Sequence, residues 1–389
     1  MPQELILAAV LSLGAHPTGP LPGPDPRRLR ATVERLATWP NRNTNNPSCR
    51  EAAEWIAGEF RAIPGVQVEL MPYDIAKGPR VPEAKSVVQV VATLPGTDPE
   101  LAAHRVLIGG HLDTINMQAG ANLATAIAPG ANDDASGVAA ALECARVLAA
   151  RPHRRTLMFV AFTGEEQGLL GSGAMAKRAK AEGWKLDAVL NNDMIGNAVS
   201  ARGDRQNRAV RVFSEDVAEH KGRELARWLE WHQRSRDPRH RVQLVFRRDR
   251  FGRGGDHTPF NQQGFTAVRV VEVHEDYRHQ HTDLDLPKFM DWGYLARNTA
   301  LNLHALHALA DAEAAPRRVR VDRAQSYEST LTWEGNPDQT YAVYWRETTS
   351  PVWQGVREVR GLRHTDPTHH KDDHIFAVGA VGGIPVVAE

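Results

Sequence analysis

The segment "RTLMFVAFTGEEQGLLGS", residues 155–172, joins a run of apolar residues to a stretch with helical apolar spacing. The apolar run lacks polar alternation, which is typical of a strand buried on both faces of a sheet. Between the run and the helix stand two adjacent glutamates, Glu165 and Glu166, flanked by Gly164 and Gly168. Two carboxylates held together raise each other's pKa unless a cation or a proton compensates. The segment therefore predicts a strand, a loop and a helix, with acidic groups that need a positive partner.

Units of the same kind recur along the chain. Apolar, strand-like runs alternate with stretches of helical spacing, and such alternation is typical of a parallel or mixed sheet covered on both faces. We therefore predict an α/β fold with a mixed, largely parallel sheet sandwiched between helices. The strand-like runs are "VQVELMPY", "SVVQVVATL", "RVLIGG", "RTLMFVAF", "LDAVLNN", "AVRVFS", "VQLVF" and "FTAVRVVEV". The predicted helices span 27–38, 48–62, 136–150, 168–182, 217–235 and 288–311.

The last part of the chain has a different pattern. The stretches "STLTWEG", "TYAVYWRET" and "HIFAVGAVG" alternate with period two, and no helical pattern separates them. We predict a main domain over 27–315 and a small all-β module, a β-sandwich, over 316–389. Within it, "TLTWEGNPDQTYAVYWRE" resembles a strand pair of a fibronectin type III domain. Its aromatic residues Trp333, Tyr341 and Tyr344 are expected in the core rather than on a binding face.

Composition narrows the possible partners. Among 389 residues, Lys plus Arg and Asp plus Glu both number 47, so no net charge favours nucleic acid or anionic lipid. No run reaches the roughly 18 apolar residues that a membrane span needs. The stretch "ELILAAVLSLGAHP" has the length of a signal-peptide apolar region, although it carries Glu4 and no preceding positive charge. We predict a possible signal segment over 1–26 and a secreted or periplasmic protein, with a cytoplasmic location left open. The oligomeric state is left open too.

The cysteines exclude one kind of metal site. Cys49 and Cys144 are the only two, and each falls in a predicted helix. They can form neither a disulfide framework nor a thiolate zinc site. Any metal ion must therefore be held by histidine and carboxylate side chains.

Such side chains follow several of the predicted strands. Each of these side chains also has a purely structural interpretation. A lone histidine at a strand end is more often structural than functional. Helix capping explains one of the residues in "NDD". Capping does not explain all three, and strand ends in an α/β sheet gather at one edge. Two histidines and several carboxylates without thiolate suit zinc, as one ion or as two with a bridging carboxylate. The residues are His111, Asp113, Asn132, Asp133, Asp134, Glu165, Glu166, Asp193, His279 and His281.

Taken together, the motifs "GGHLD", "PGANDDASG", "GEEQGLLGS", "NND" and "HT" resemble those of the M28 family of co-catalytic zinc peptidases, over roughly residues 30–310. This family includes leucyl-type aminopeptidases and glutamate carboxypeptidases. The resemblance implies the zinc exopeptidase fold and two zinc ions per chain. It implies that Asp133 bridges the ions, that His111 and Asp193 complete one site, and that Glu166 and His281 complete the other.

The resemblance also implies roles for four further residues. Glu165 would be the general base, and Asp113 would accept the second ring N–H of His111. The peptide bond between Asp133 and Asp134 would be cis. Family members often have tyrosine immediately before the last histidine, whereas this chain has Gln280.

We therefore expect a zinc-dependent exopeptidase acting on peptide substrates, most simply an aminopeptidase. The alternatives are a carboxypeptidase or dipeptidase on the same scaffold, a glutaminyl cyclase, and a secreted binding protein without activity.

Three other segments carry weaker signals. In "RFGRGGDHTPF", Asp256 and His257 either contact the substrate or form a turn into a helix. The segment "THHKDDH" is expected to be an exposed loop rather than a metal site. A basic run is expected on the solvated surface, with capture of a peptide carboxylate as the alternative. It consists of Arg247, Arg248, Arg250 and Arg253.

Overall fold

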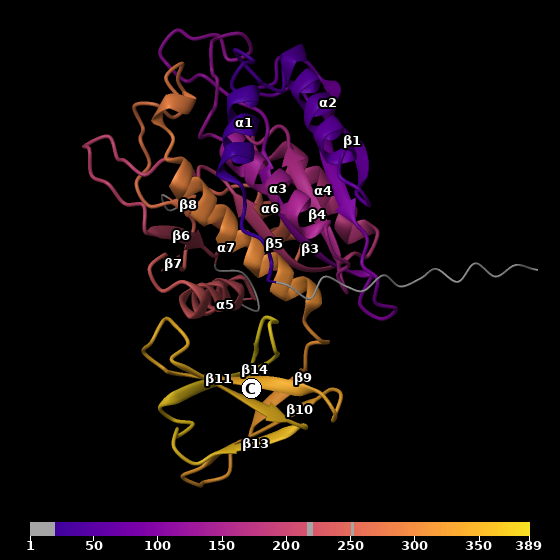
Figure 1. Ribbon diagram of the computed structural model, residues 1–389, viewed down its shortest axis with the longest axis vertical. Helices are drawn as coiled ribbons and strands as arrows, with labels where there is room; N and C mark the ends of the chain where they lie inside the picture. The colour runs from indigo at the N-terminus through magenta and orange to yellow at the C-terminus, as the bar shows by residue number, and fades with distance from the viewer. Residues whose placement is uncertain (1–19, 216–220, 250–252) are drawn as a thin grey trace, which may run out of the picture.

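The computed structural model describes residues 20–215, 221–249 and 253–389. An eight-stranded sheet with helices on both faces forms one part of the molecule, and two small antiparallel sheets form the other (Figure 1). The predicted α/β fold with an all-β C-terminal part is thus confirmed. Most of the predicted signal segment over 1–26 lies outside the described residues, as does Arg250.

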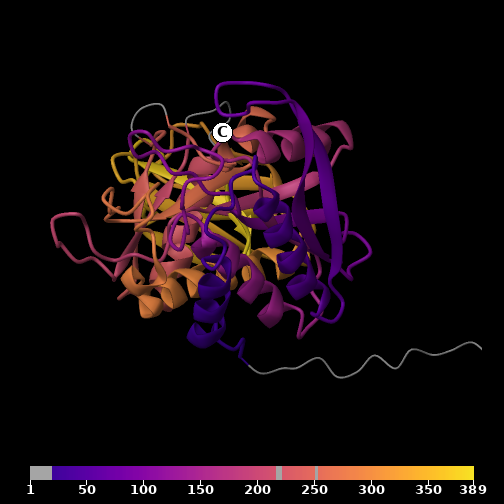
Figure 2. The same ribbon diagram turned by 90° about the horizontal axis from the view of Figure 1, so that it is seen from above.

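The large sheet has the strand order β1-β2-β4-β3-β5-β8-β6-β7. Its central strands β4, β3, β5 and β8 are parallel to their neighbours in this group, while the β1–β2 hairpin is antiparallel and forms one edge (Figure 2). Strand β4 is buried along its whole length, as its unbroken apolar run predicts. The strands are β1 (Gln67–Ile75), β2 (Lys85–Leu94), β3 (His104–His111), β4 (Thr156–Phe162), β5 (Lys185–Asn192), β6 (Ala209–Phe213), β7 (Arg241–Val245) and β8 (Ala267–Glu272).

Helices cover the two faces unequally. Helices α1, α2, α3, α5 and α7 share one large core with the sheet, while α4 and α6 pack with a smaller core on the other face. Because both faces are covered, functional side chains reach solvent mainly at the strand ends. The helices are α1 (Pro26–Leu36), α2 (Pro47–Arg61), α3 (Ala135–Leu148), α4 (Leu170–Ala181), α5 (Lys221–Arg236), α6 (His257–Gln262) and α7 (Trp292–Asp311).

Two helices differ from their predicted bounds for local reasons. Helix α4 begins at Leu170 rather than 168, because Gly168 and Leu169 both have positive φ values, of 116° and 60°. The predicted helix over 288–311 is split into a short 3₁₀ turn, Pro287–Phe289, and α7. The split falls at Asp291, whose side chain accepts the backbone N–H of Tyr294 and caps α7. None of the helices in the described ranges is both long and apolar enough to cross a membrane.

The C-terminal part consists of one three-stranded and one four-stranded antiparallel sheet. Trp333, Tyr341 and Tyr344 are buried, as predicted. A boundary at 316 between two independently folding units remains a prediction. The strands are β9 (Arg317–Val321), β10 (Ser329–Glu334), β11 (Thr340–Glu347), β12 (Gly355–Arg360), β13 (Arg363–Asp366), β14 (His374–Ala380) and β15 (Val386–Val387).

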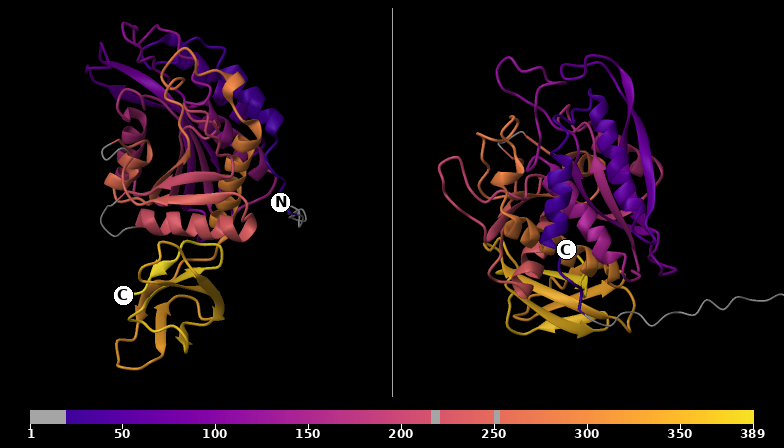
Figure 3. Two further views of the ribbon diagram at one scale, coloured as in Figure 1. Left: turned by 90° about the vertical axis from the view of Figure 1, so that its left-hand side faces the viewer. Right: turned by 45° about the horizontal axis from the view of Figure 1, so that its top comes forward.

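This β module lies against α5 of the main domain (Figure 3). Trp231 on α5 meets the ring of Tyr344 edge-on, with ring centroids 6.1 Å apart. The Arg234 guanidinium donates to the backbone carbonyl of Trp353 at 2.7 Å. A cavity of about 1020 Å³ opens between the two parts, lined by residues that include Arg155 and Pro385.

Candidate metal centre

The carboxyl ends of three parallel strands bring the candidate residues to one edge of the sheet. Strand β3 ends at His111, Glu165 lies three residues after the end of β4, and β5 ends immediately before Asp193. Asp133 directly precedes the N-cap residue of α3, and His281 lies in the connection from β8 to α7. Residues from five separate segments therefore converge at the place that strand geometry favours for ligands.

Asp133 lies at the centre of the cluster. Its Oδ1 is 2.9 Å from Nε2 of His111, and its Oδ2 is 3.1 Å from Nε2 of His281. Nε2 of His111 is also 3.7 Å from Oδ1 of Asp193, and Nε2 of His281 is 3.0 Å from Oε1 of Glu166. The structure thus forms two groups, each of one histidine and one carboxylate, that share the carboxylate of Asp133.

The hydrogen bonding of His111 fits a metal ion. Its Nδ1 lies 3.0 Å from the backbone carbonyl of Asp113, and a carbonyl can only accept, so Nδ1 carries the proton. In a neutral ring, Nε2 then offers a lone pair toward Asp133. Oδ1 of Asp133 is buried and makes no hydrogen bond, although Nε2 is only 2.9 Å away. Two acceptor atoms that face each other in this way suit a cation between them, and the nitrogen and oxygen donors suit zinc.

The electrostatics of the cluster also favour positive charge. Burial lowers the pKa of His281, but Glu166 and Asp133 outweigh this effect and raise it to about 11. Burial likewise opposes the ionisation of Asp133, yet the adjacent rings of His111 and His281 hold its pKa well below the usual range. The site therefore attracts a proton or a metal ion strongly.

Asp113 acts through a different atom from the one expected. The backbone carbonyl of Asp113, not its carboxylate, meets the ring nitrogen of His111. The carboxylate instead accepts the backbone N–H groups of Glu165 at 3.2 Å and Glu166 at 3.1 Å. Asp113 therefore fixes both the tautomer of His111 and the path of the glutamate loop.

The two glutamates point to different places. Glu166 is buried and directed at His281, whereas Glu165 is partly exposed and has its carboxylate close to the ring of His111. Burial, together with the charge of Glu166, raises the pKa of Glu165 well above its ordinary value. Gly164 permits this divergence, because its φ is 75° and a Cβ there would come within 2.9 Å of the Tyr73 hydroxyl.

Two acidic residues hold the loop that carries Asp133. Asp285 accepts the backbone N–H of Asn132 and of Asp133, both at 2.9 Å. Asp134 caps α3 through the N–H of Gly137 and also accepts the N–H of His111 at 3.0 Å. The peptide bond between Asp133 and Asp134 is cis, as the family resemblance implies. Asp285 stands in the segment "HTDLDLP", and nothing in that sequence distinguishes it from Asp283.

Arg269 is a second supporting residue that the sequence reasoning missed. It lies on β8, is buried, and places Nη2 3.0 Å from Oδ2 of Asp193 and Nη1 3.2 Å from Oδ2 of Asp249. Its charge outweighs the effect of burial and lowers the pKa of Asp193. The available signal was an arginine inside the apolar run "FTAVRVVEV", since a buried charge must be paired.

His279 lies apart from the metal ligands, whereas Gln280, where family members often have tyrosine, contacts Asp133. The ring of His279 stacks on Phe289, with centroids 4.0 Å apart, and its Nδ1 is 3.3 Å from Asp276. Gln280 donates from Nε2 to Oδ2 of Asp133 at 3.0 Å. This amide therefore supports Asp133.

The segment around Asp256 is buried rather than exposed. Burial raises the pKa of Asp256 to about 7, and Nε2 of His257 lies 3.4 Å from the Glu215 carboxylate. Arg247 and Arg248 of the basic run are exposed, as expected, and Arg253 is half-buried. Arg248 is 3.4 Å from buried Glu215, and Arg253 is 2.9 Å from buried Asp249. Arg253 thus shares Asp249 with Arg269.

Comparisons with known proteins agree with this geometry. The model of "Peptidase family M28" matches residues 89–306. A protein of Pyricularia oryzae named as a probable zinc metalloprotease is 35% identical over 412 residues, covering 92% of this chain and 80% of its own. A probable zinc metalloprotease of Leptosphaeria maculans is 32% identical, covering 98% of this chain and 95% of its own.

Solved structures share the fold at lower identity. The zinc aminopeptidase BSAP from Bacillus subtilis is similar with a TM-score of 0.58 and 16% identity, over 73% of this chain and 95% of its own. Glutaminyl cyclase from Porphyromonas gingivalis is similar with the same TM-score of 0.58 and 18% identity, over 73% of this chain and 98% of its own. At these identities the likeness concerns the fold alone.

Proposed function

The chain belongs to peptidase family M28 and is therefore a metallopeptidase, and we propose that it is a zinc-dependent aminopeptidase that removes N-terminal residues from peptides. The observation that carries this proposal is the shared carboxylate of Asp133 between two histidine and carboxylate groups, with Glu165 beside them. Such a donor set suits two zinc ions with a bridging carboxylate.

The proposed roles of the metal-holding residues follow from their contacts. Asp133 would bind both ions, His111 and Asp193 would complete one position, and Glu166 and His281 the other. Bound zinc would polarise the scissile carbonyl and lower the pKa of the attacking water.

Glu165 is the proposed general base. It accepts the proton of the attacking water and then delivers it to the leaving amine. Glu166 is unsuited to this task because its carboxylate is engaged with His281. Asp113 keeps the two roles apart, since it holds the backbone N–H groups of both glutamates. Gln280 takes no part in this scheme beyond its hydrogen bond to Asp133.

Other activities on this scaffold remain alternatives. The similarity to a glutaminyl cyclase keeps cyclisation of N-terminal glutamine as the second candidate. A carboxypeptidase or dipeptidase would use the same residues with the substrate reversed or shortened. An inactive binding protein is disfavoured by the presence of Glu165 next to the cluster.

A panel of short peptides separates these activities. Each peptide is offered with a free N-terminus, with an acetylated N-terminus and with an amidated C-terminus, with and without a chelator. We expect release of the first residue only from free N-termini, and loss of release with the chelator. Cleavage that requires a free C-terminus, or loss of ammonia from N-terminal glutamine without hydrolysis, would replace the aminopeptidase assignment.

The proposal includes export, on the basis of the apolar stretch within residues 1–26. Sequencing the N-terminus of the protein from its native source tests it. A mature chain that begins between residues 15 and 30, as signal-peptide lengths imply, supports export, and one that begins at Met1 contradicts it.

A further inference from the structure

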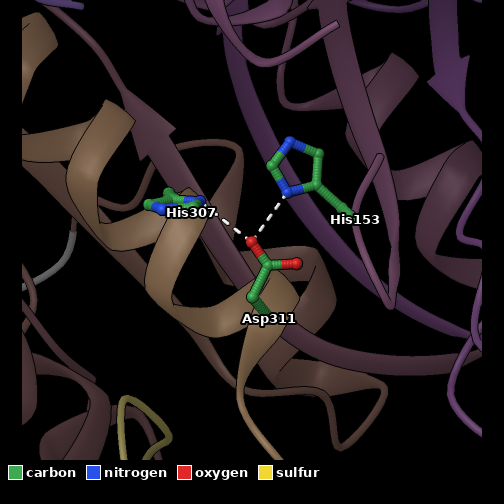
Figure 4. A group of neighbouring side chains, drawn as sticks. All are labelled: His153, His307 and Asp311. Carbon is green, nitrogen blue, oxygen red and sulfur yellow. Dashed lines mark hydrogen bonds and ion pairs between the residues drawn. The ribbon is translucent and has the colours of Figure 1, made fainter. Parts of the chain in front are cut away.

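A second group of two histidines and a carboxylate lies far from Asp133, at the opposite edge of the large sheet. His153 is in the loop between α3 and β4, three residues before β4 begins. His307 and Asp311 are one turn apart on the last part of α7. Figure 4 shows both rings directed at the Asp311 carboxylate. None of these residues takes part in the proposed peptidase chemistry.

The distances place three donor atoms around one point. Oδ2 of Asp311 is 2.9 Å from Nδ1 of His153 and 2.9 Å from Nδ1 of His307. The three donor atoms all lie within 4.8 Å of one another. A single carboxylate oxygen thus faces two imidazole nitrogens, from two separate segments of the chain.

The second ring nitrogen of His153 determines what the first can do. Nε2 lies 3.0 Å from the backbone carbonyl of Leu148, which can only accept, so Nε2 carries a proton. In the neutral ring, Nδ1 then presents a lone pair to the Asp311 carboxylate. A metal-binding histidine commonly donates its other N–H to a backbone carbonyl in this way. His153 therefore has the surroundings of a ligand, and its side chain is only 1% exposed.

The other two residues complete the argument. Nδ1 of His307 is buried and makes no hydrogen bond, although Oδ2 of Asp311 is 2.9 Å away. Oδ1 of Asp311 is occupied by the backbone N–H of Arg154 at 3.1 Å, which leaves Oδ2 directed at the rings. The side chains of His307 and Asp311 are 33% and 32% exposed, so solvent reaches the cluster from one side.

We propose that His153, His307 and Asp311 bind a divalent transition-metal ion, most favourably zinc, at a site separate from the peptidase centre. Two imidazoles and a carboxylate without thiolate suit zinc, and water from the exposed side would complete four ligands. The ion fastens the last turn of α7 to the loop before β4. The proposed site is therefore at the end of α7, directly before the segment that connects Asp311 to β9 of the module.

The test measures zinc binding by the full chain in a background without the bridging ligand. Asp133→Ala protein is stripped with a chelator and titrated with Zn²⁺ against a competing chromophoric chelator. His307→Gln and Asp311→Asn are added singly to this background, because both side chains are partly exposed and the changes preserve size. His304→Gln, which removes a partly exposed histidine from the same helix, is the matched control.

We expect both cluster variants to bind one zinc equivalent fewer than the Asp133→Ala parent, and His304→Gln to bind as many as the parent. Zinc should also raise the thermal unfolding midpoint of the parent more than that of either cluster variant. An anomalous zinc peak beside His153 in crystals would support the site directly. Equal zinc binding by the parent and by folded His307→Gln and Asp311→Asn proteins would overturn the proposed metal site. The three residues would then connect the loop and α7 without a metal ion. Because peptide hydrolysis is not measured, this outcome is independent of the proposed aminopeptidase activity.

Discussion

The clusters around Asp133 and Asp311 lie at opposite edges of one sheet and share a simple plan, in which a carboxylate stands between two histidines. The two clusters differ in the residues that surround them. Around Asp133, further carboxylates add negative charge, and Arg269 and Asp285 hold the ligands in place. Around Asp311, support comes from backbone contacts, in which Leu148 accepts from His153 and Arg154 donates to Asp311.

A site for chemistry and a site for stability need different groups around the metal ligands. Only the Asp133 cluster keeps a carboxylate, Glu165, that is close to the site and not needed to hold the cluster together. A reacting site needs such a group to accept a proton, whereas a structural site needs only ligands.

The largest effect is expected when the two neighbouring glutamates are changed separately. Glu165→Gln keeps the shape but cannot accept the water's proton, so turnover should fall by about 10²–10⁴ while zinc content is unchanged. Glu166→Gln should weaken zinc binding instead, because an amide is a poor ligand beside a carboxylate. Turnover and zinc content are measured on the same samples.

His304→Gln serves as the control for both variants, since it lies on α7 away from the glutamate loop. If Glu165→Gln lost zinc while Glu166→Gln kept it, the two roles would have to be exchanged. If both variants had full activity, the peptidase mechanism itself would be wrong.

A smaller effect is expected when the carboxylate that holds the glutamate loop, Asp113, is changed. Asp113→Asn retains the backbone carbonyl that meets His111 but weakens acceptance of the N–H groups of Glu165 and Glu166. Removal of such supporting contacts typically costs 10–100-fold in metal affinity or activity. Zinc affinity measured by chelator competition checks this. Wild-type affinity in Asp113→Asn would mean that the loop keeps its path without the carboxylate.

A third prediction uses a buried histidine whose hydrogen-bond partner is an amide. Nε2 of His240 lies 2.8 Å from Oδ1 of Asn298, and burial lowers the pKa of His240 below its ordinary value. The unfolded chain then binds more protons below about pH 6.5, so stability is complete above that pH and is lost as the pH falls, by up to about 1.4 kcal/mol per unit.

His240→Gln should therefore flatten the decline in stability between pH 7.5 and pH 5.5. Urea unfolding at both values, with a chelator present throughout, measures the difference. His304→Gln cannot serve here, because burial also lowers the pKa of His304, to about 4, so the control is the wild-type chain. An unchanged pH dependence would show that His240 binds the same number of protons in the folded and the unfolded chain, which contradicts a lowered pKa.

The smallest effect on turnover is expected from removal of the β module. All proposed catalytic ligands precede residue 316, so a chain ending at Ala315 should hydrolyse a short peptide at close to the wild-type rate. Its stability should fall, because Trp231 loses Tyr344 and Arg234 loses the carbonyl of Trp353. A folded, zinc-loaded truncation that is inactive would show that the module helps to form the substrate site.

The sequence predicted the main sheet because burial leaves a clear pattern. An unbroken apolar run such as β4 is recognisable, since both of its faces must exclude water. Strand β12 was not predicted, because its residues are mostly exposed or half-buried and alternate weakly. Strand β15 has only two residues, too few for any period to appear.

Some residues of the two sites could be predicted from the sequence and others could not. The residues around Asp133 follow successive strands, and parallel strands end at the same edge, so their convergence was predictable. Asp285 reaches Asp133 across 152 residues of chain through backbone N–H groups, and no local pattern encodes such a contact. The group at Asp311 has only the one-turn spacing of His307 and Asp311 as a signal, and that spacing is common on ordinary helices.

The wide separation of the Asp133 cluster along the chain has a consequence for how the protein is made. His281 follows His111 by 170 positions in the chain. At about 5–20 residues per second, a ribosome needs roughly 9–34 s to add them. During that time Asp133 has emerged without one of its two histidines. A nascent chain stalled before His281 should therefore hold zinc weakly, and metal acquisition becomes a late event in biosynthesis that waits for the last third of the chain.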